Sequence, residues 1–314
     1  MSEKKDESKA KATSKSTLTD LVASRLALYT KPKGGANAYG ITHVAITKLA
    51  EVDLKTVGIT HYTYKTVDFF YRVQEDAKKL LLVSHSAIGI PKAICGCNDD
   101  IHVHLAPLPV FRCFNWVLPN VNVFGISDKL LEIYTNQRIR STSFSSTIKH
   151  DYRAIYDEII DYIIKSQSHT NVLSFGSSDG GYPALYNACR FNTKVLIANT
   201  QPYPEQHSPR WEAFCKAVKD TDDKDAVKDF MPIETAIATF GAPKQTVFYC
   251  NLNDNYAFIK SAIQFATFAK KAKLDNIEVI FFISSEPDRP GKDAHSTYMP
   301  DGVDVVQLCG ADGI

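Results

Sequence analysis

Short apolar runs that alternate with helix-period stretches constrain the fold of this chain more than any other feature. The runs are Leu80–Ser84, Val121–Ile126, Val172–Phe175, Val195–Ala198, Thr246–Cys250 and Ile277–Ile283. Helical patterns lie between several of them, at Tyr152–Lys165, Tyr182–Arg190, Arg210–Lys219 and Tyr256–Lys271. Apolar runs of this length are typical of strands buried on both faces, and helical crossovers between such strands are typical of βαβ units. We therefore predict an α/β fold with a mostly parallel, doubly wound sheet.

The segments before residue 80 have a different residue pattern. Residues 41–75 are rich in Thr, Tyr, Val and Phe and are predicted to form strands and hairpins, with Thr56–Tyr64 and Thr66–Val73 alternating as antiparallel strands do. Leu18–Tyr29 has the apolar spacing of a short helix. Residues 1–17 are rich in Lys and have no apolar side chain larger than Ala between Ser2 and Ser16, so we expect a disordered tail there. The prediction is one α/β domain over residues 18–314, with residues 199–243 forming a lid-like insertion above the carboxyl ends of the strands.

The charge balance argues against a role in binding nucleic acid. The chain has 36 Lys and Arg against 35 Asp and Glu, whereas nucleic-acid binding relies on a basic excess that neutralises phosphates. No apolar run approaches the ~20 residues of a membrane span, and the N-terminus lacks the apolar core of a secretory signal. Seven cysteines, an odd number scattered along the chain, suit reduced thiols. We expect a soluble, cytoplasmic protein with no membrane span.

The most informative motif is Gly176-x-Ser178-x-Gly180-Gly181, which directly follows one predicted strand and directly precedes a predicted helix. In that context a strained strand-to-helix turn raises the middle Ser out of the sheet, and the glycines let the turn close. The alternative is an ordinary serine in an anion-binding turn, but no Lys occupies the position expected in a phosphate-binding loop.

This segment resembles the nucleophile elbow of the α/β-hydrolase superfamily. The resemblance implies a triad in the order Ser178, Asp254, His295, and both later residues follow predicted strands. It implies that His295 is the general base and that Asp254 orients the imidazole. It also implies an oxyanion hole formed by the N–H groups of Asp179 and Ser86. The alternatives are a helix-capping role for Asp254 and a surface loop position for His295.

A narrower likeness covers residues 80–205, which resemble serine-hydrolase-like proteins of bacterial capsule and surface-polysaccharide synthesis. This likeness would imply action on an acylated glycan or an accessory role in glycan assembly. Our first hypothesis is a serine hydrolase or acyltransferase that forms an acyl-serine intermediate at Ser178 on an ester or thioester, with a small-molecule or glycan acyl ester as substrate and no cofactor. We expect His85, at the end of a strand, and His207, in the insertion, to contact substrate; the alternative for His207 is an exposed loop position. The competing hypothesis is a non-catalytic accessory protein of polysaccharide assembly that keeps the fold.

Two short motifs raise the question of a metal site. His102-x-His104 places two imidazoles on one face of a strand, and Cys95-Gly96-Cys97 pairs two thiols. Neither has further ligands at a recognisable spacing, so we predict no metal, and a metal-dependent hydrolase remains the third hypothesis.

Overall fold

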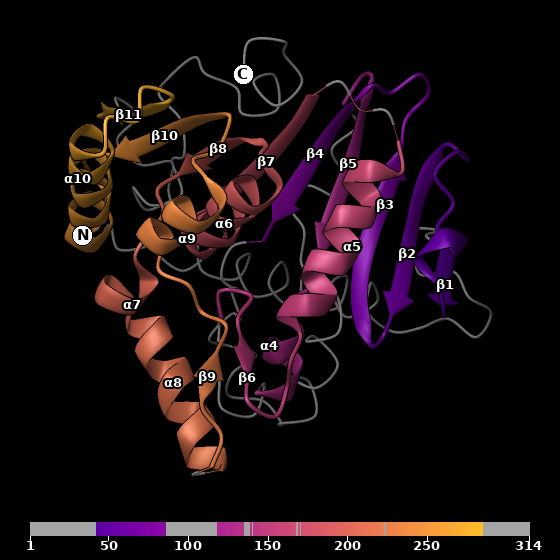
Figure 1. Ribbon diagram of the computed structural model, residues 1–314, viewed down its shortest axis with the longest axis horizontal. Helices are drawn as coiled ribbons and strands as arrows, with labels where there is room; N and C mark the ends of the chain where they lie inside the picture. Colours follow the sequence, from indigo (N-terminus) through magenta and orange to yellow (C-terminus); the bar gives the residue numbers. More distant parts are fainter. Residues whose placement is uncertain are drawn as a thin grey trace, which may run out of the picture.

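The computed structural model describes residues 42–85, 118–134, 139, 141–167, 169, 171–222 and 224–284. Its centre is a nine-stranded sheet in the order β1-β2-β3-β5-β4-β7-β8-β10-β11 (Figure 1). The strands are β1 (Thr42–Ile46), β2 (Gly58–Tyr64), β3 (Val67–Val73), β4 (Lys79–Ser84), β5 (Val121–Ile126), β7 (Asn171–Ser177), β8 (Lys194–Ala198), β10 (Gln245–Asn251) and β11 (Ile277–Phe282). The helix expected at 18–29 lies outside the described residues.

The direction of the strands confirms the predicted fold class. From β5 to β11 every neighbouring pair is parallel, whereas β3 is antiparallel to both β2 and β5. The sheet is therefore mostly parallel with an antiparallel N-terminal part. Strand β1 falls within residues 41–75, where the composition predicted strands without giving its bounds, and it pairs parallel with β2 at the edge of the sheet.

Helices cover the face of the sheet that is turned toward the viewer in Figure 1. They are α5 (Arg153–Lys165), α6 (Gly181–Phe191), α9 (Ile233–Phe240) and α10 (Tyr256–Lys271). Residues Val195, Leu196 and Ile197 of β8 are fully buried in succession, as expected for a strand covered on both faces. The four helices predicted between the apolar runs are all present within two residues of their expected ends, and α9 was not predicted.

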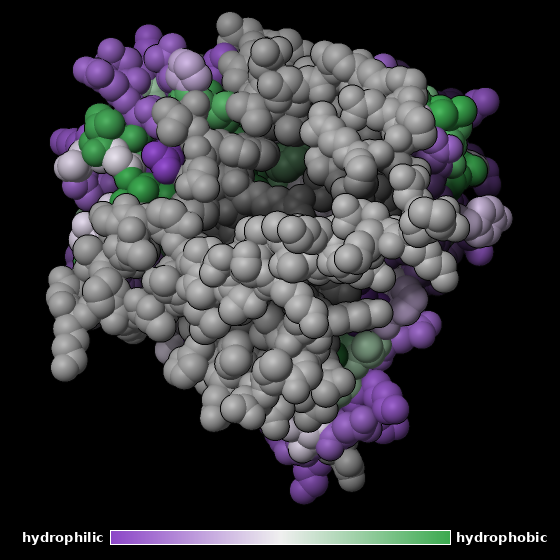
Figure 2. All heavy atoms as spheres, turned by 180° about the vertical axis from the view of Figure 1, so that it is seen from behind, coloured by the Kyte–Doolittle hydropathy of each residue, from purple (hydrophilic) through white to green (hydrophobic). Residues whose placement is uncertain are grey.

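A separate layer of short elements lies below the strand ends in Figure 1. It contains α4 (Lys129–Ile133), β6 (Ser146–Thr147), α7 (Pro204–His207), α8 (Pro209–Thr221) and β9 (Val227–Lys228). Helices α4 and α8 share a small core of their own, in which Leu130, Tyr134, Trp211 and Phe214 pack together. The exposed end of α8 is hydrophilic (Figure 2). We call α7, α8 and β9 the covering segment.

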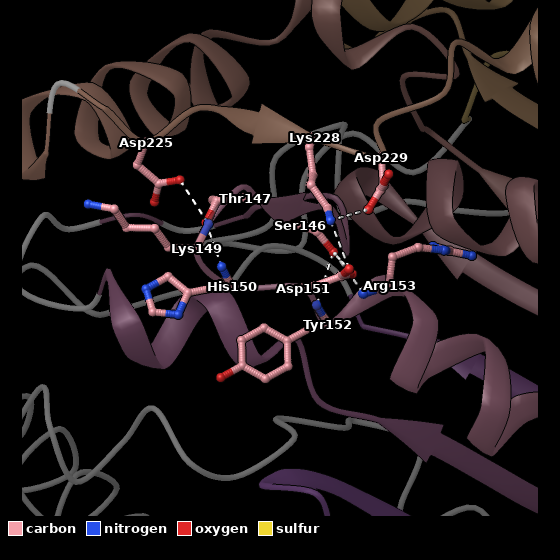
Figure 3. A network of polar contacts seen from close by, with 10 residues as sticks. All are labelled: Ser146, Thr147, Lys149, His150, Asp151, Tyr152, Arg153, Asp225, Lys228 and Asp229. Atoms are coloured by element: carbon pink, nitrogen blue, oxygen red, sulfur yellow. Dashed lines mark hydrogen bonds and ion pairs between the residues drawn. The ribbon is translucent and has the colours of Figure 1, made fainter.

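Polar contacts fasten the covering segment to the start of α5 (Figure 3). Ser146 pairs with Lys228 in the two-stranded β6–β9 ladder, and its hydroxyl accepts the N–H of Arg153 at 2.8 Å. Lys228 reaches Asp151 at 2.8 Å. On the other side of the ladder, the Asp225 carboxylate accepts the Lys149 N–H at 3.2 Å. The ladder thus links residues about 80 positions apart, and it holds the covering segment beside α5.

Among the described helices, none combines the length and the apolar character needed to cross a lipid bilayer.

Candidate active site

The turn at Ser178 joins β7 to α6 and has an unusual backbone. Ser178 has φ of +54°, in the left-handed region that residues with a side chain rarely adopt, and it is only 4% exposed. One 3-10 turn, Ser178–Gly180, precedes α6. Non-glycine residues held in this conformation cluster at active sites, because the surrounding structure must offset the strain. The backbone here therefore matches the strained strand-to-helix turn that the motif predicted.

Three glycines let this turn pack against its neighbours. A Cβ atom at Gly180 would overlap the carbonyl oxygens of Ser84 and His85 at the end of β4. One at Gly176 would overlap the Gly180 carbonyl, and one at Gly181 would overlap the side chain of Thr200. These glycines are needed for close approach, since none has a positive φ. The turn is thereby fitted between the ends of β4 and β8.

The ends of β8 and β10 are joined beside this turn. The Thr200 hydroxyl donates to the carbonyl oxygen of Ser178. Asn199, which has φ of +43°, accepts the Asn251 N–H on its side-chain oxygen at 2.8 Å. Both asparagines are fully buried, so the hydrogen bond from the Asn251 backbone to the Asn199 side chain holds the end of β10 in a fixed position beside the loop after β8.

Asp254 follows β10 in one of these loops and is 9% exposed. Its side chain accepts the N–H of Asn255 at 2.6 Å, and its own N–H donates to the carbonyl of Asn251 at 3.0 Å. Helix α10 is capped by Asn255, whose side chain accepts the Ala257 N–H at 2.9 Å. The cap is thus supplied by the next residue, and the alternative reading of Asp254 as the capping side chain is wrong.

His85 and Asp128 form a buried pair beside the turn. The N–H of Asp128 donates to His85 Nε2 at 3.3 Å, and the imidazole packs on Phe144 with ring centroids 5.0 Å apart. The Asp128 carboxylate accepts the Thr142 hydroxyl and the Phe144 N–H. Burial raises the pKa of Asp128, although His85 and these hydrogen bonds act in the opposite direction. The pair connects the loop after β4 with the loop after β5.

An ion pair links the covering segment to the Ser178 turn. Arg210, near the start of α8, lies 2.6 Å from the carboxylate of Asp179, whose side chain is 7% exposed. A carboxylate buried to this extent needs a partner, and the guanidinium supplies it. The position of α8 is therefore coupled to the residue directly after Ser178.

His207 ends α7 and is half-buried rather than exposed. Its Nε2 lies 3.0 Å from the side-chain oxygen of Gln264 in α10, and its carbonyl accepts the side-chain N–H of Gln201 at 3.2 Å. Both contacts serve to position α7.

The structure brings together only part of the predicted site. Ser178, Asp179 and His85 lie at one turn, where the end of β4 packs on the elbow. Ser86, His295, His102, His104 and the pair Cys95 and Cys97 lie outside the described residues. Sequence reasoning missed Asp128 and Arg210. Asp128 could have been found by its place directly after a predicted strand, whereas no local signal marks Arg210.

The mostly parallel sheet, the antiparallel strand β3 and the serine on the strand-to-helix turn match the α/β-hydrolase-like fold that the sequence predicted. No protein-family model matches the chain, and no curated protein does.

Several solved structures are similar to the chain. A capsule O-acetyltransferase of Neisseria meningitidis serogroup A has a TM-score of 0.49 at 16% identity, over 73% of this chain and 88% of that one. An esterase of the bacterial hormone-sensitive lipase family has a TM-score of 0.45 at 11% identity, over 83% and 84%. Carboxyl esterase 2 from the fungus Tuber melanosporum has a TM-score of 0.37 at 11% identity, over 85% and 87%. At these scores, no activity is carried over to this chain.

Proposed function

We propose that the protein is a serine hydrolase or acyltransferase that forms an acyl-enzyme on Ser178. The backbone of Ser178, at φ of +54° between β7 and α6, is the observation that carries this proposal. A strained turn of this kind presents the hydroxyl at the carboxyl end of the sheet, next to the first turn of a helix. The N-terminus of α6 stabilises negative charge that develops on an oxygen there.

In the proposed first step, the Ser178 hydroxyl attacks the carbonyl carbon of an ester or thioester. His295 takes the hydroxyl proton and then delivers it to the leaving alcohol or thiol. Asp254 holds the imidazole in the required tautomer and stabilises its charged form. Water or an acceptor hydroxyl then releases the acyl group, with His295 acting again as base and acid.

The oxyanion of the tetrahedral intermediate is assigned to the N–H groups of Asp179 and Ser86. Two contacts support this assignment. Gly180 packs on the carbonyls of Ser84 and His85, so the residues on either side of the proposed hole are in direct contact. His85, the residue before Ser86, accepts the Asp128 N–H on its Nε2, and this contact ties the start of the loop after β4 to the loop after β5. His85 therefore has a positioning role for this loop, in addition to the substrate contact proposed from the sequence.

Residues of the covering segment are proposed to shape the substrate site, with His207 as a substrate contact. A small acyl ester, free or on a glycan, is the proposed substrate class. The competing proposal is an accessory protein of glycan assembly in which the same turn has lost its chemistry.

Labelling with a fluorophosphonate probe, followed by peptide mass spectrometry, tests the proposal. We expect a single adduct on Ser178 that disappears in Ser178→Ala. Ser177→Ala is the matched control, because Ser177 is also buried but has an extended backbone, and it should keep the adduct. Folded wild-type protein that takes up no probe would refute the acyl-enzyme and favour the accessory role. His295→Ala and Asp254→Ala should slow labelling while leaving the adduct on Ser178.

A further inference from the structure

Three potential metal-ligating side chains gather on the N-terminal strands, away from the Ser178 turn. His43 on β1 and His61 on β2 are direct neighbours in the parallel register. Asp68 on β3 is opposite Thr63 in the antiparallel register, two residues along β2 from His61. Neighbouring positions in register, and positions two apart on one strand, share a face of the sheet. These residues therefore lie on the same face of three adjacent strands, which Figure 1 shows at one edge of the sheet.

The donor atoms of these residues are close enough to share an ion. One ligand atom from each of His43, His61 and Asp68 lies within 4.8 Å of the other two. His61 Nε2 is 3.1 Å from the Asp68 carboxylate, near the ~3.3 Å that separates two ligands of a tetrahedral ion with bonds of about 2.0 Å. A small rotation of the His43 ring would bring its donor nitrogen within reach of an ion held by His61 and Asp68.

The buried surroundings of His61 and Asp68 favour an ion that keeps few water ligands. His61 and Asp68 are each 8% exposed, and the ring of His61 is stacked on Phe70 with centroids 4.7 Å apart. The backbone also fixes the set, since the carbonyl of Asp68 accepts the Ser127 N–H at 2.8 Å. Ligands on paired strands are more rigid than ligands on loops, and such rigidity favours metal binding.

We propose that His43, His61 and Asp68 bind one divalent transition-metal ion, for which Zn²⁺ is the probe. Two imidazole nitrogens and one carboxylate oxygen are ligands that zinc prefers, and a water molecule completes a tetrahedral site with three protein ligands. Bound metal would fasten the edge strand β1 to β2 and β3. Since β5 and β4 separate β3 from β7, the site lies about 14 Å or more from the Ser178 strand at ~4.8 Å per strand. It is thus independent of the proposed acyl-enzyme.

The competing explanation is a hydrogen-bonded chain without metal. The Thr63 hydroxyl lies 2.9 Å from His43 Nε2 and also contacts the Asp68 carboxylate, which in turn contacts His61. Such a chain leaves each of these polar atoms with a partner. The two explanations differ at Thr63, because the hydrogen-bonded chain needs its hydroxyl and the metal site does not.

Isothermal titration of the chelator-stripped full chain with ZnCl₂ tests the proposal. We expect one ion per chain and a rise in Tm of about 4 °C at a free zinc concentration near 100 Kd. His43→Gln and Asp68→Asn should each weaken binding at least about tenfold. Thr63→Val, which keeps the three ligands, should bind zinc with unchanged stoichiometry. No binding by folded wild-type protein, or binding unaffected by both ligand variants, would overturn the proposal.

Two controls assign the ion to this site even where a buried variant fails to fold. The double variant His102→Gln/His104→Gln should keep full zinc affinity, and loss of binding there would move the ion to those residues. Substitution with Co²⁺ should give visible bands without the thiolate charge-transfer band that a cysteine site adds. The appearance of a thiolate band would also rule out the assignment of the ion to His43, His61 and Asp68. His43→Gln is the milder of the ligand variants, because His43 is only half-buried on an edge strand.

Discussion

Gly180→Ala is expected to disable the proposed oxyanion hole while leaving the protein folded. The added Cβ would lie 2.7 Å from the His85 carbonyl oxygen and closer still to that of Ser84, whereas ordinary contacts begin at 3.4 Å. The end of β4 and the start of α6 must therefore separate by about 0.7 Å or more. Both contacts are with backbone atoms of a central strand, so rotation of a side chain cannot relieve them.

We expect this displacement to lower both the stability of the protein and the rate of probe labelling. Overpacking of this kind costs ~1–3 kcal/mol of stability, and the rigid backbone at both contacts places Gly180→Ala near the upper end. Because the proposed oxyanion hole draws on the segments that follow these two contacts, the rate of probe labelling at Ser178 should fall about 10²-fold, as a shift near 1 Å can cause. Stability is measured by urea denaturation, and labelling is measured as a second-order rate on the folded protein.

Gly241→Ala provides the matched control. Gly241 has φ of +94° with no atom within 4 Å of its Cβ position, so alanine there adds backbone strain without a clash. We expect a cost of about 1 kcal/mol and an unchanged labelling rate. The reasoning fails if Gly180→Ala labels as fast as the wild-type protein, or if Gly241→Ala slows labelling to the same extent.

Three further substitutions test other parts of the structure. Arg210→Ala should destabilise the protein by ~1–3 kcal/mol in urea, because it leaves the Asp179 carboxylate buried without its partner; Asp179→Asn in the same background should recover part of this loss. Burial acts to raise the pKa of Asp225, but hydrogen bonds led by that from Thr147 outweigh it and lower the pKa below 3.8. The Asp225 carboxylate therefore adds stability above about pH 4 that is lost as the pH falls through its folded-state pKa, and Asp225→Asn should flatten the urea midpoint between pH 5 and pH 3. Phe214→Ala should cost ~3–5 kcal/mol within the small core of the covering segment, so limited proteolysis should cut α8 before the sheet; simultaneous cleavage everywhere would contradict a separate core.

The strands of the parallel sheet were readable from the sequence because burial on both faces produces unbroken apolar runs. The run 195–198, for example, is β8 with only one residue added. Strand β1 was expected only as part of the strand-rich residues 41–75, and its bounds were not readable, since residues 42–45 are exposed or half-buried and give no apolar run. The β6–β9 ladder has only two residues on each strand, too few to show any period.

The candidate site likewise contains a part that the sequence predicted and contacts that it did not. The strand-to-helix position of Ser178 follows from a local motif, whereas the Arg210–Asp179 ion pair joins residues that are 31 positions apart. Likewise, His43, His61 and Asp68 come from three strands, at a spacing that matches no metal motif, and only the sheet register brings them together. Contacts that depend on tertiary pairing leave no local pattern to read.

The positive φ of Ser178 also bears on how this protein would respond to selection. Glycine adopts φ of +54° without penalty and asparagine adopts it readily, whereas serine does so at a cost of ~1–3 kcal/mol. A library screened only for heat resistance should therefore enrich glycine or asparagine at position 178. If Ser178 carries the proposed acyl-enzyme, serine should be retained only under a screen that also demands this activity, so the residue recovered at position 178 tests the proposal.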